Sequence, residues 1–503
     1  MKFKIEITNC DSIILDDIKS VNVLMKKVGK IYLDTFNENY PSTINITIYV
    51  VADGYDEKVG SLSFQKRGEV KALGIPSMHC SNQSLDVDRL LELGLKDYIN
   101  TYKELRYLDI KNNSYKKYII EGDKDKTIAR YGGIDVPYDS CRVVTYPKYM
   151  FYILYFEKIS KGYIDYTYLL RKREDDTAVA EAEEPDTSDN NTYNKVDVEL
   201  YEELLSYSKS FVKAHLETPE KFTKKQILKA RSYFEKLKKA TTVDSFNNVL
   251  SELVMLSPRK RNVFSGDKIK SSFATDTSDF LRILDFEETL LIAMETVYKN
   301  QNNIKVVKNP LLKCFEKEDI DVFLATDAQK QEVLSYLSPY YQNKVDRVYR
   351  VKPRKQEEIF RKYVKENNIK NIKKLWHGSV NSNWLSIVEN GLIITKSAAN
   401  GRMFGDGIYF ANSDDKSFGY TSYSGSRWAK GHSDVAIMGL YATAYGTPEY
   451  PTGWGAMKYT EDSLKNNGKN CVHATASNTG LRKDEIIFYN KEAVCLNYLV
   501  FFK

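Results

Sequence analysis

The segment LWHGSVNSNWLSIVENGL, residues 375–392, contains one of only five histidines in a chain of 503 residues. Its first residues read as the end of a short apolar strand, which places His377 at the strand tip. Trp384, Ile387 and Val388 then recur at the spacing of one helix face, and Gly391 ends that helix. A histidine in this place is either a ligand-binding group or an ordinary loop residue, and the rest of the sequence has to distinguish the two.

A glycine-rich segment follows, NGRMFGDGIYFANSDDKSFGY, residues 400–420. Its glycines indicate a backbone that turns tightly or lies close to a ligand. A dinucleotide-binding G-x-G-x-x-G motif is excluded, because no third glycine stands at the required offset and no long helix follows. Tyr409 lies in a β-like run over 408–411, and Lys416, Ser417 and Tyr420 come after it.

A third segment near the C-terminus, KDEIIFYN, residues 483–490, reads as a strand that begins with a carboxylate. Glu485, Ile487 and Tyr489 would share one face of this strand, and Ile486 and Phe488 the other. A carboxylate that opens an apolar strand is either a solvent-facing strand end or a group placed in a cleft.

Together the motifs LWHGS, GxMFGxGIYFA, KSxxY and DEIIxY resemble, in order and spacing, the catalytic domain of the poly(ADP-ribose) polymerases. These are diphtheria-toxin-type ADP-ribosyltransferases with a His-Tyr-Glu triad, which matches His377, Tyr409 and Glu485. The resemblance implies a β-sandwich-like catalytic core over residues 305–503. It also implies NAD as the substrate, protein acceptors and no metal.

The resemblance assigns a role to each matching residue on the nicotinamide side of NAD. Gly378 would hold the nicotinamide amide with its backbone groups, where a side chain would block the approach. Ser417 would give a hydroxyl hydrogen bond to the same amide. Tyr420 would stack on the nicotinamide ring with Tyr409 on the other side, and His377 would bond a ribose hydroxyl.

The remaining assignments concern the adenosine side and the chemistry. Ser379 and Asn383 match positions near the adenosine. Glu485 would hold the 2′-hydroxyl of the nicotinamide ribose, stabilise the oxocarbenium ion and polarise the incoming hydroxyl, so polymer formation is possible. Lys416 would order this region, unless it is an exposed loop lysine. The family often has an arginine where this chain has Ile393, so contacts to the far side of NAD are expected to differ.

Upstream, residues 196–304 show helical periodicity throughout and resemble the helical regulatory subdomain of the DNA-dependent members of the family. Leu200, Leu204 and Leu205 fall on one side of the first helix. Thr223 in FTKKQI is placed to cap the next helix, with Gln226 three residues later. These features predict an all-α subdomain packed on another part of the chain.

Residues 104–173 resemble a WGR domain less closely. A hairpin is expected, with a strand at 116–120, a turn at 122–126 and a second strand that ends at Tyr131-Gly132-Gly133. A helix stopped near Gly162 follows it. The name-giving triplet is altered at Tyr131-Gly132-Gly133 and lacks the arginine, which puts DNA binding through this domain in doubt. Residues 1–103 read as a small α/β domain of unknown role, with a strand over 44–50 and a helix over 87–98.

Residues 174–195 form an acidic, polar segment that cannot bury enough apolar area to offset chain entropy. We expect a disordered linker, or equivalently a solvated loop. Its carboxylates Glu181, Glu183 and Glu184 are candidate automodification sites.

The overall composition is that of a globular protein, with 42% hydrophobic and 28% charged residues. Six cysteines occur without a CxxC pair, and nothing near Met78-His79-Cys80 completes a metal site. The sequence shows no signal peptide and no run of 18 apolar residues, so no membrane partner is expected. The sparse thiols suit a reducing intracellular compartment, nuclear or cytoplasmic.

We therefore expect an α+β multidomain protein in which small α/β domains and a helical regulatory subdomain precede the catalytic core. Its expected function is NAD-dependent transfer of ADP-ribose to proteins, itself included, activated by DNA breaks. Net charge +6 and a basic stretch over 344–374 permit an anionic partner, although a solvated surface is the favoured interpretation of that stretch. The alternatives are a DNA-independent mono-ADP-ribosyltransferase and a DNA- or protein-binding scaffold with a vestigial catalytic fold.

Overall fold

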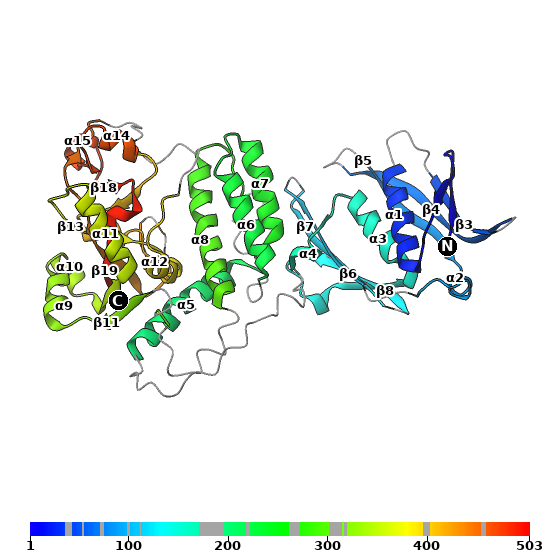
Figure 1. Cartoon of the computed structure of the whole chain (residues 1–503), viewed down its shortest axis with the longest axis horizontal. Helices are drawn as coiled ribbons and strands as arrows, with labels where there is room; N and C mark the ends of the chain where they lie inside the picture. The colour runs from blue at the N-terminus through cyan, green and yellow to red at the C-terminus, as the bar shows by residue number, and fades with distance from the viewer. Residues whose placement is uncertain are drawn as a thin grey trace. The chain divides into compact units, whose positions relative to one another are not determined.

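The computed structural model describes most of the chain. The described ranges are 1–35, 43–52, 55–70, 75–97, 101–110, 112–123, 125–170, 195–217, 222–260, 272–300, 314–315, 319–395, 403–427, 429, 431–453 and 459–503. The predicted linker over 174–195, with its three candidate automodification glutamates, lies almost wholly outside the described residues. Two compact units make up the fold, Met1–Asp175 with Val254–Ser272, and Asp176–Leu253 with Phe273–Lys503 (Figure 1).

The first unit begins with a five-stranded antiparallel sheet in the order β2-β1-β3-β4-β5. Its elements are β1 (Phe3–Ile7), β2 (Ile13–Leu15), α1 (Val21–Thr35), β3 (Thr43–Ala52), β4 (Tyr55–Val70), β5 (Ile75–Leu85) and α2 (Val87–Glu92). Ile44, Ile46 and Ile48 are all buried, which confirms the predicted strand alternation. The helix predicted over 87–98 is too long, because α2 ends at Glu92 and Gly94 follows with a φ of 93°.

A second antiparallel sheet in this unit has the order β10-β6-β7-β8-β9. Its elements are β6 (Thr101–Asp109), β7 (Ser114–Gly122), β8 (Lys126–Gly133), β9 (Arg142–Pro147), α3 (Phe151–Ser160), β10 (Ile164–Asp165) and α4 (Thr167–Leu170). The predicted hairpin is confirmed, since Lys116 on β7 pairs with Gly133 on β8. The predicted helix stop is confirmed too, because α3 ends at Ser160 and Gly162 has a φ of 82°.

Four long helices carry the predicted helical region. They are α5 (Lys195–His215), α6 (Lys224–Leu237), α7 (Val243–Leu256) and α8 (Asp279–Asn300). Thr223 caps α6 as expected, with its hydroxyl accepting from the backbone N–H of Gln226 at 3.1 Å. The last turn of α7 belongs to the first unit, where Arg106 Nη1 donates to the carbonyl oxygens of Met255 (2.6 Å) and Leu256 (3.1 Å). An arginine at this place satisfies carbonyl groups that the helix itself leaves unpaired.

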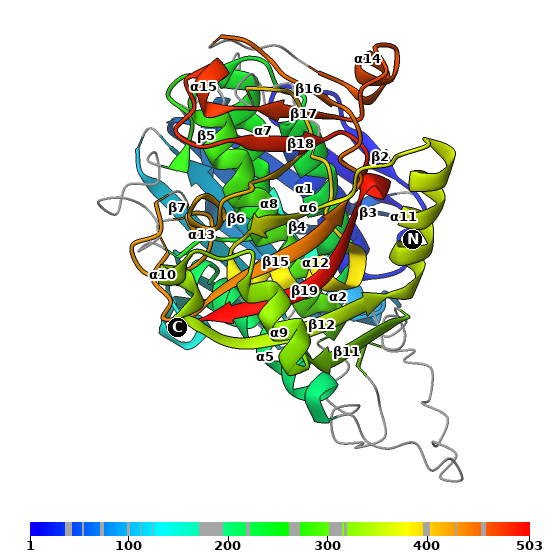
Figure 2. The ribbon, with the colours of Figure 1, turned by 90° about the vertical axis from the view of Figure 1, so that its left-hand side faces the viewer.

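The rest of the second unit contains two sheets. One has five antiparallel strands in the order β11-β12-β19-β15-β13. The other has four strands in the order β14-β18-β17-β16, of which β16 and β17 are parallel. The strands are β11 (Ile320–Leu324), β12 (Val345–Pro353), β13 (Lys373–Gly378), β14 (Ile408–Phe410), β15 (Ala436–Thr443), β16 (Pro448–Glu449), β17 (Cys471–Ala474), β18 (Glu485–Phe488) and β19 (Val494–Phe502). Figure 2 shows β16, β17 and β18 side by side, apart from the group of β11, β12, β19 and β15.

Short helices connect and cover these strands. They are α9 (Asp327–Leu334), α10 (Pro339–Gln342), α11 (Arg354–Glu366), α12 (Trp384–Asn390), α13 (Asp414–Phe418), α14 (Glu461–Lys465) and α15 (Ala476–Thr479). The predicted helix after His377 is confirmed as α12, and Gly391 follows it with a φ of 76°.

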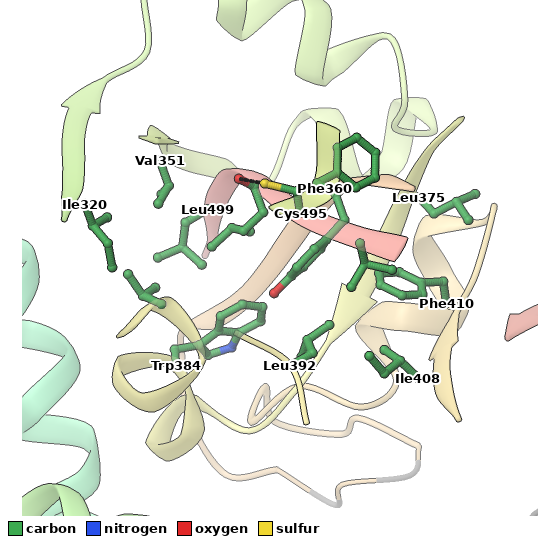
Figure 3. Close-up of a cluster of buried hydrophobic side chains, with 14 of the residues drawn as sticks. Ile320, Val351, Phe360, Leu375, Trp384, Leu392, Ile408, Phe410, Cys495 and Leu499 are labelled. Carbon is green, nitrogen blue, oxygen red and sulfur yellow. Dashed lines mark hydrogen bonds between the residues drawn. The ribbon is translucent and has the colours of Figure 1, made fainter. Parts of the chain in front are cut away.

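One apolar core joins the two sheets to the helices around them. Figure 3 shows Phe360 of α11, Trp384 of α12, Phe410 of β14 and Leu499 of β19 gathered in this cluster. The stripe Leu200, Leu204 and Leu205 of α5 is buried in the same cluster. The helical region therefore shares a core with the C-terminal sheets, and α5 is part of that core.

Candidate active site

Two backbone hydrogen bonds bring the strand tip of β13 against the end of β14. Trp376 N donates to Ala411 O at 3.0 Å, and Ala411 N donates to Trp376 O at 3.1 Å. This bridge lies between the five-stranded and the four-stranded sheet. It places His377 beside Tyr409, and His377 Nδ1 lies 3.0 Å from the carbonyl oxygen of Tyr409.

The imidazole of His377 is enclosed by aromatic rings. The ring centroids of Phe410, Tyr441 and Trp384 lie 5.5, 6.1 and 6.4 Å away. Burial disfavours the charged form and lowers the pKa of His377 to about 4, so the ring is neutral near pH 7. A carbonyl oxygen can only accept, hence Nδ1 carries the proton and Nε2 is left as an acceptor.

Glu485 opens β18, as the sequence predicts for a carboxylate at a strand start. Tyr409 on β14 stands opposite Ile487, so Tyr409 and Glu485 point to the same face of this strand pair. Lys416 Nζ lies 2.7 Å from Glu485 Oε1, and both side chains are largely buried, at 12% and 15% exposed. Lys416 Nζ also donates to Lys483 O at 3.0 Å. Lys416 is therefore no exposed loop lysine, because it forms an ion pair with the glutamate.

Helix α13 packs directly against the end of β13. Ser417 Oγ donates to Trp376 O at 3.0 Å. A Cβ added to Gly378 would lie 1.8 Å from the carbonyl oxygen of Ser417, far inside any real contact distance. Glycine is thus required at 378 by the approach of α13 alone, whatever ligand binds there.

The two tyrosines of the expected site differ in their surroundings. The Tyr409 hydroxyl donates to Gly405 O at 2.9 Å and accepts from Phe404 N at 3.3 Å. These bonds fasten the glycine-rich turn to β14. The side chain of Tyr420, by contrast, is 41% exposed, so its ring face can be covered by a ligand.

Ser379 and Asn383 contact each other beside α12. Asn383 Nδ2 donates to Ser379 Oγ at 3.1 Å, and Trp384 Nε1 donates to Ser379 O at 3.3 Å. Asn383 Oδ1 is buried without a hydrogen-bond partner among the residues that the structure describes. A buried acceptor of this kind costs free energy unless a ligand or water satisfies it.

The structure thus brings His377, Tyr409, Glu485 and Lys416 together, with Gly378 and Ser417 adjoining them. Three polar residues next to this group were missed by the sequence analysis, because they belong to no recognisable motif. They are Tyr445, His473 and Asp484. Among the residues that the structure describes, no group of three or more His, Cys, Asp or Glu side chains is placed to hold a metal ion. Within the same residues, no helix is both long and apolar enough to cross a lipid bilayer.

Comparison with known proteins identifies the family to which this C-terminal region belongs. The family described as poly(ADP-ribose) polymerase catalytic domain matches residues 328–503. A poly(ADP-ribose) polymerase-like protein, 100L, of Invertebrate iridescent virus 6 is 30% identical over 165 residues, covering 31% of this chain and 86% of that protein. The chain belongs to the poly(ADP-ribose) polymerase family and is an NAD+ ADP-ribosyltransferase.

Two cellular relatives match shorter stretches. Human poly(ADP-ribose) polymerase 2 is 52% identical over 48 residues, which is 9% of this chain and 8% of that protein. Poly(ADP-ribose) polymerase tankyrase of Caenorhabditis elegans is 40% identical over 81 residues, 16% of this chain and 3% of that protein. The chain therefore aligns with most of the viral relative but with only small parts of these two.

Proposed function

We propose that this enzyme transfers ADP-ribose from NAD to protein acceptors, itself included, with Glu485 as the catalytic carboxylate. The observation that carries the proposal is the convergence of His377, Tyr409 and Glu485 from three different strands, with Lys416 paired to the glutamate. None of these contacts follows from proximity in the sequence.

The nicotinamide end of NAD would bind at Gly378. Hydrogen-bonding groups alternate sides along a strand, so the N–H and C=O of Gly378 face the same side as those of Trp376, which bond Ala411. That side is away from β15 and next to α13. A carboxamide needs one donor and one acceptor, and the Gly378 backbone supplies both. Ser417 Oγ, which donates to Trp376 O, can accept a bond from the amide, and the exposed ring of Tyr420 can stack on the pyridine.

The ribose and adenosine groups would meet acceptors on the other side of the site. The neutral His377 presents Nε2 as an acceptor for a ribose hydroxyl, since Nδ1 is used by Tyr409. Asn383 Oδ1 is a buried acceptor that no described residue bonds, which suits a hydroxyl or amino donor of the adenosine.

In this proposal Glu485 acts by charge and by hydrogen bonding. The nicotinamide of NAD is cationic and leaves without needing a proton. The bond breaks as positive charge develops on the ribose, and a fixed carboxylate beside that carbon stabilises the charge. The same carboxylate can accept the proton of an attacking hydroxyl, which then bonds to the anomeric carbon.

We further propose that the helical region gates this site and that DNA breaks relieve the gating. Contacts with the segment around α12 support it. Ser208 Oγ of α5 donates to Ser382 O at 2.8 Å, and Lys299 of α8 pairs with Glu389 at 3.1 Å. Deletion of the helices would expose the apolar core that α5 shares with the C-terminal sheets, so it would not test gating alone. The sharper test replaces Lys299 with methionine, which we expect to raise basal activity, and unchanged basal activity would count against gating.

The experiment that tests the proposed function is incubation with labelled NAD, with and without nicked 5′-phosphorylated DNA, beside Glu485→Gln. A product smear that needs DNA and is lost in Glu485→Gln supports a break-activated polymerase. A single band independent of DNA supports the mono-transferase instead, which the altered triplet Tyr131-Gly132-Gly133 favours. Activity that persists in Glu485→Gln refutes the catalytic assignment.

Automodification of the acidic segment is a separate part of the proposal. Mass spectrometry of the labelled protein should find ADP-ribose between residues 174 and 193, on Glu181, Glu183 or Glu184. Modification confined to other segments would contradict it.

A further inference from the structure

A chain of hydrogen bonds lies behind the glutamate that opens β18. The Tyr445 hydroxyl lies 2.6 Å from His473 Nδ1, and His473 Nε2 lies 3.1 Å from Asp484 Oδ2. Asp484 directly precedes Glu485 in the sequence. His473 pairs in register with Ile486, whereas Tyr409 stands opposite Ile487. Neighbouring residues of a strand point to opposite faces, so the hydrogen-bonded group of Tyr445, His473 and Asp484 lies on the face opposite to the Glu485 side chain.

The chemistry of the groups sets the direction of the bond between His473 and Asp484. The carboxylate of Asp484 can only accept, so His473 Nε2 carries a proton and donates it. Nδ1 on the other side of the ring faces the hydroxyl of Tyr445, which also lies 3.4 Å from the hydroxyl of Tyr450. Both partners are well enclosed, because the His473 side chain is 11% exposed and Tyr445 is 3% exposed. Buried polar networks of this kind are rigid when every member is satisfied.

Asp484 also joins β18 to segments on both of its sides. Its Oδ1 accepts from the backbone N–H of Ala476 at 2.9 Å, just after β17. Its Oδ2 accepts from Asn412 Nδ2 at 3.4 Å, just after β14. These are the two strands that flank β18. Asp484 therefore links the start of β18, next to Glu485, to the segments that follow β17 and β14.

We propose that His473 is a positioning residue for ADP-ribosyl transfer, which acts with Asp484 and Tyr445 by fixing the direction of Glu485. The inference rests on the proposed role of Glu485. A strand of four residues frays most easily at its first residue, because the ladder of backbone bonds ends there. Lys416 holds the carboxylate from the other face, but a long, flexible side chain cannot by itself fix the backbone at 484 and 485.

The test is steady-state release of nicotinamide from NAD by the full-length protein. His473→Ala should lower kcat by about tenfold to a hundredfold, because a shift of about 1 Å in a catalytic group costs up to about a hundredfold. KM for NAD should stay within about twofold, and nicotinamide should inhibit as before, since Gly378 and Ser417 are untouched. His473→Gln should recover part of kcat, because its amide N–H can donate to Asp484.

Two further variants make the result decisive. Ser477→Ala is the matched control, because Ser477 is exposed on the nearby helix α15 and its hydroxyl bonds Thr475 and Asn478; this variant should keep the wild-type kcat. Tyr445→Phe removes one oxygen and keeps the ring, and should lower kcat by about threefold to tenfold. If His473→Ala does not fold, the kcat of Tyr445→Phe alone tests the proposed role of His473.

The outcomes separate this inference from the proposed function. Wild-type kcat in Tyr445→Phe and in a folded His473→Ala would overturn the inference, as would a loss that appears only in KM. If Glu485→Gln abolishes activity in the same assay, such a result leaves the catalytic assignment intact. If Glu485→Gln is fully active, the proposed function fails, and the inference fails with it.

Discussion

The neutral, partly buried His377 makes the stability of the second unit depend on pH in a way that can be calculated. Burial lowers the pKa of His377 from 6.5 to about 4 in the folded protein. The unfolded chain therefore binds one more proton between these two values, and stability falls as pH falls through that window. Above pH about 6.5 neither state is protonated at this residue, and the effect vanishes.

The magnitude follows from the two pKa values. At about pH 5 the unfolded histidine is almost fully protonated while the folded one is almost fully neutral. Linkage then gives a loss of about 2 kcal/mol between about pH 7 and about pH 5 from this residue alone. His377→Gln is the comparison protein, because glutamine can donate to the Tyr409 carbonyl but does not titrate.

The measurement is urea unfolding followed by tryptophan fluorescence. All four tryptophans of the chain, at positions 376, 384, 428 and 454, lie in the matched family region, so the signal reports that region alone. Wild type should lose about 2 kcal/mol more than His377→Gln between the two pH values. Other titrating groups cancel in that difference. Equal losses in the two proteins would refute a neutral, desolvated His377, and with it the assignment of Nε2 as an acceptor.

Three further variants test the site directly. Gly378→Ala should lower kcat/KM by about a hundredfold and the free energy of unfolding by about 3 kcal/mol, because its methyl group would meet the Ser417 carbonyl. Near-normal kinetics and an unchanged urea midpoint would contradict this. Lys416→Met should lower kcat at least about tenfold and leave KM for NAD little changed, as measured by nicotinamide release. An effect on KM without any fall in kcat would argue against a role of Lys416 in holding Glu485. Tyr420→Ala should raise KM for NAD about tenfold while Tyr420→Phe does not, because stacking needs the ring and not the hydroxyl; equal KM values would exclude stacking.

Local structure could be predicted from the sequence wherever local chemistry determined it. The hairpin of β7 and β8, the cap at Thr223 and the helix stop at Gly391 depend on residues a few positions apart, and all three are confirmed. The prediction of a helix over 87–98 was wrong in its end point, and the cause is again a local residue. Apolar spacing continues past residue 92, but Gly94 adopts a positive φ that ends the helix earlier.

The candidate site was predictable in its motifs and not in its supporting contacts. The collision that requires glycine at 378 comes from Ser417, 39 positions later, which no local pattern reveals. His473 bonds Asp484 across 11 positions and Tyr445 across 28, and none of the three stands in a spacing with a chemical meaning. Sheet register creates these contacts, and register in a sheet of non-consecutive strands depends on the whole fold.

The pair between Lys416 and Glu485 raises a question about charge that the geometry answers. A cation 2.7 Å from a carboxylate weakens the negative field that a developing oxocarbenium ion would experience. Lys416 contacts Oε1 and the backbone oxygen of Lys483, so it lies on the side of the glutamate that faces its own chain. In the proposed mechanism, the second carboxylate oxygen of Glu485 is the one that faces the ribose. Fixed orientation contributes more than net charge in a site of this kind, because no reorganisation is needed as the bond breaks. Lys416→Met leaves Glu485 with its full negative field and removes the contact that holds its carboxylate group, so a fall in kcat shows that this contact outweighs the added charge.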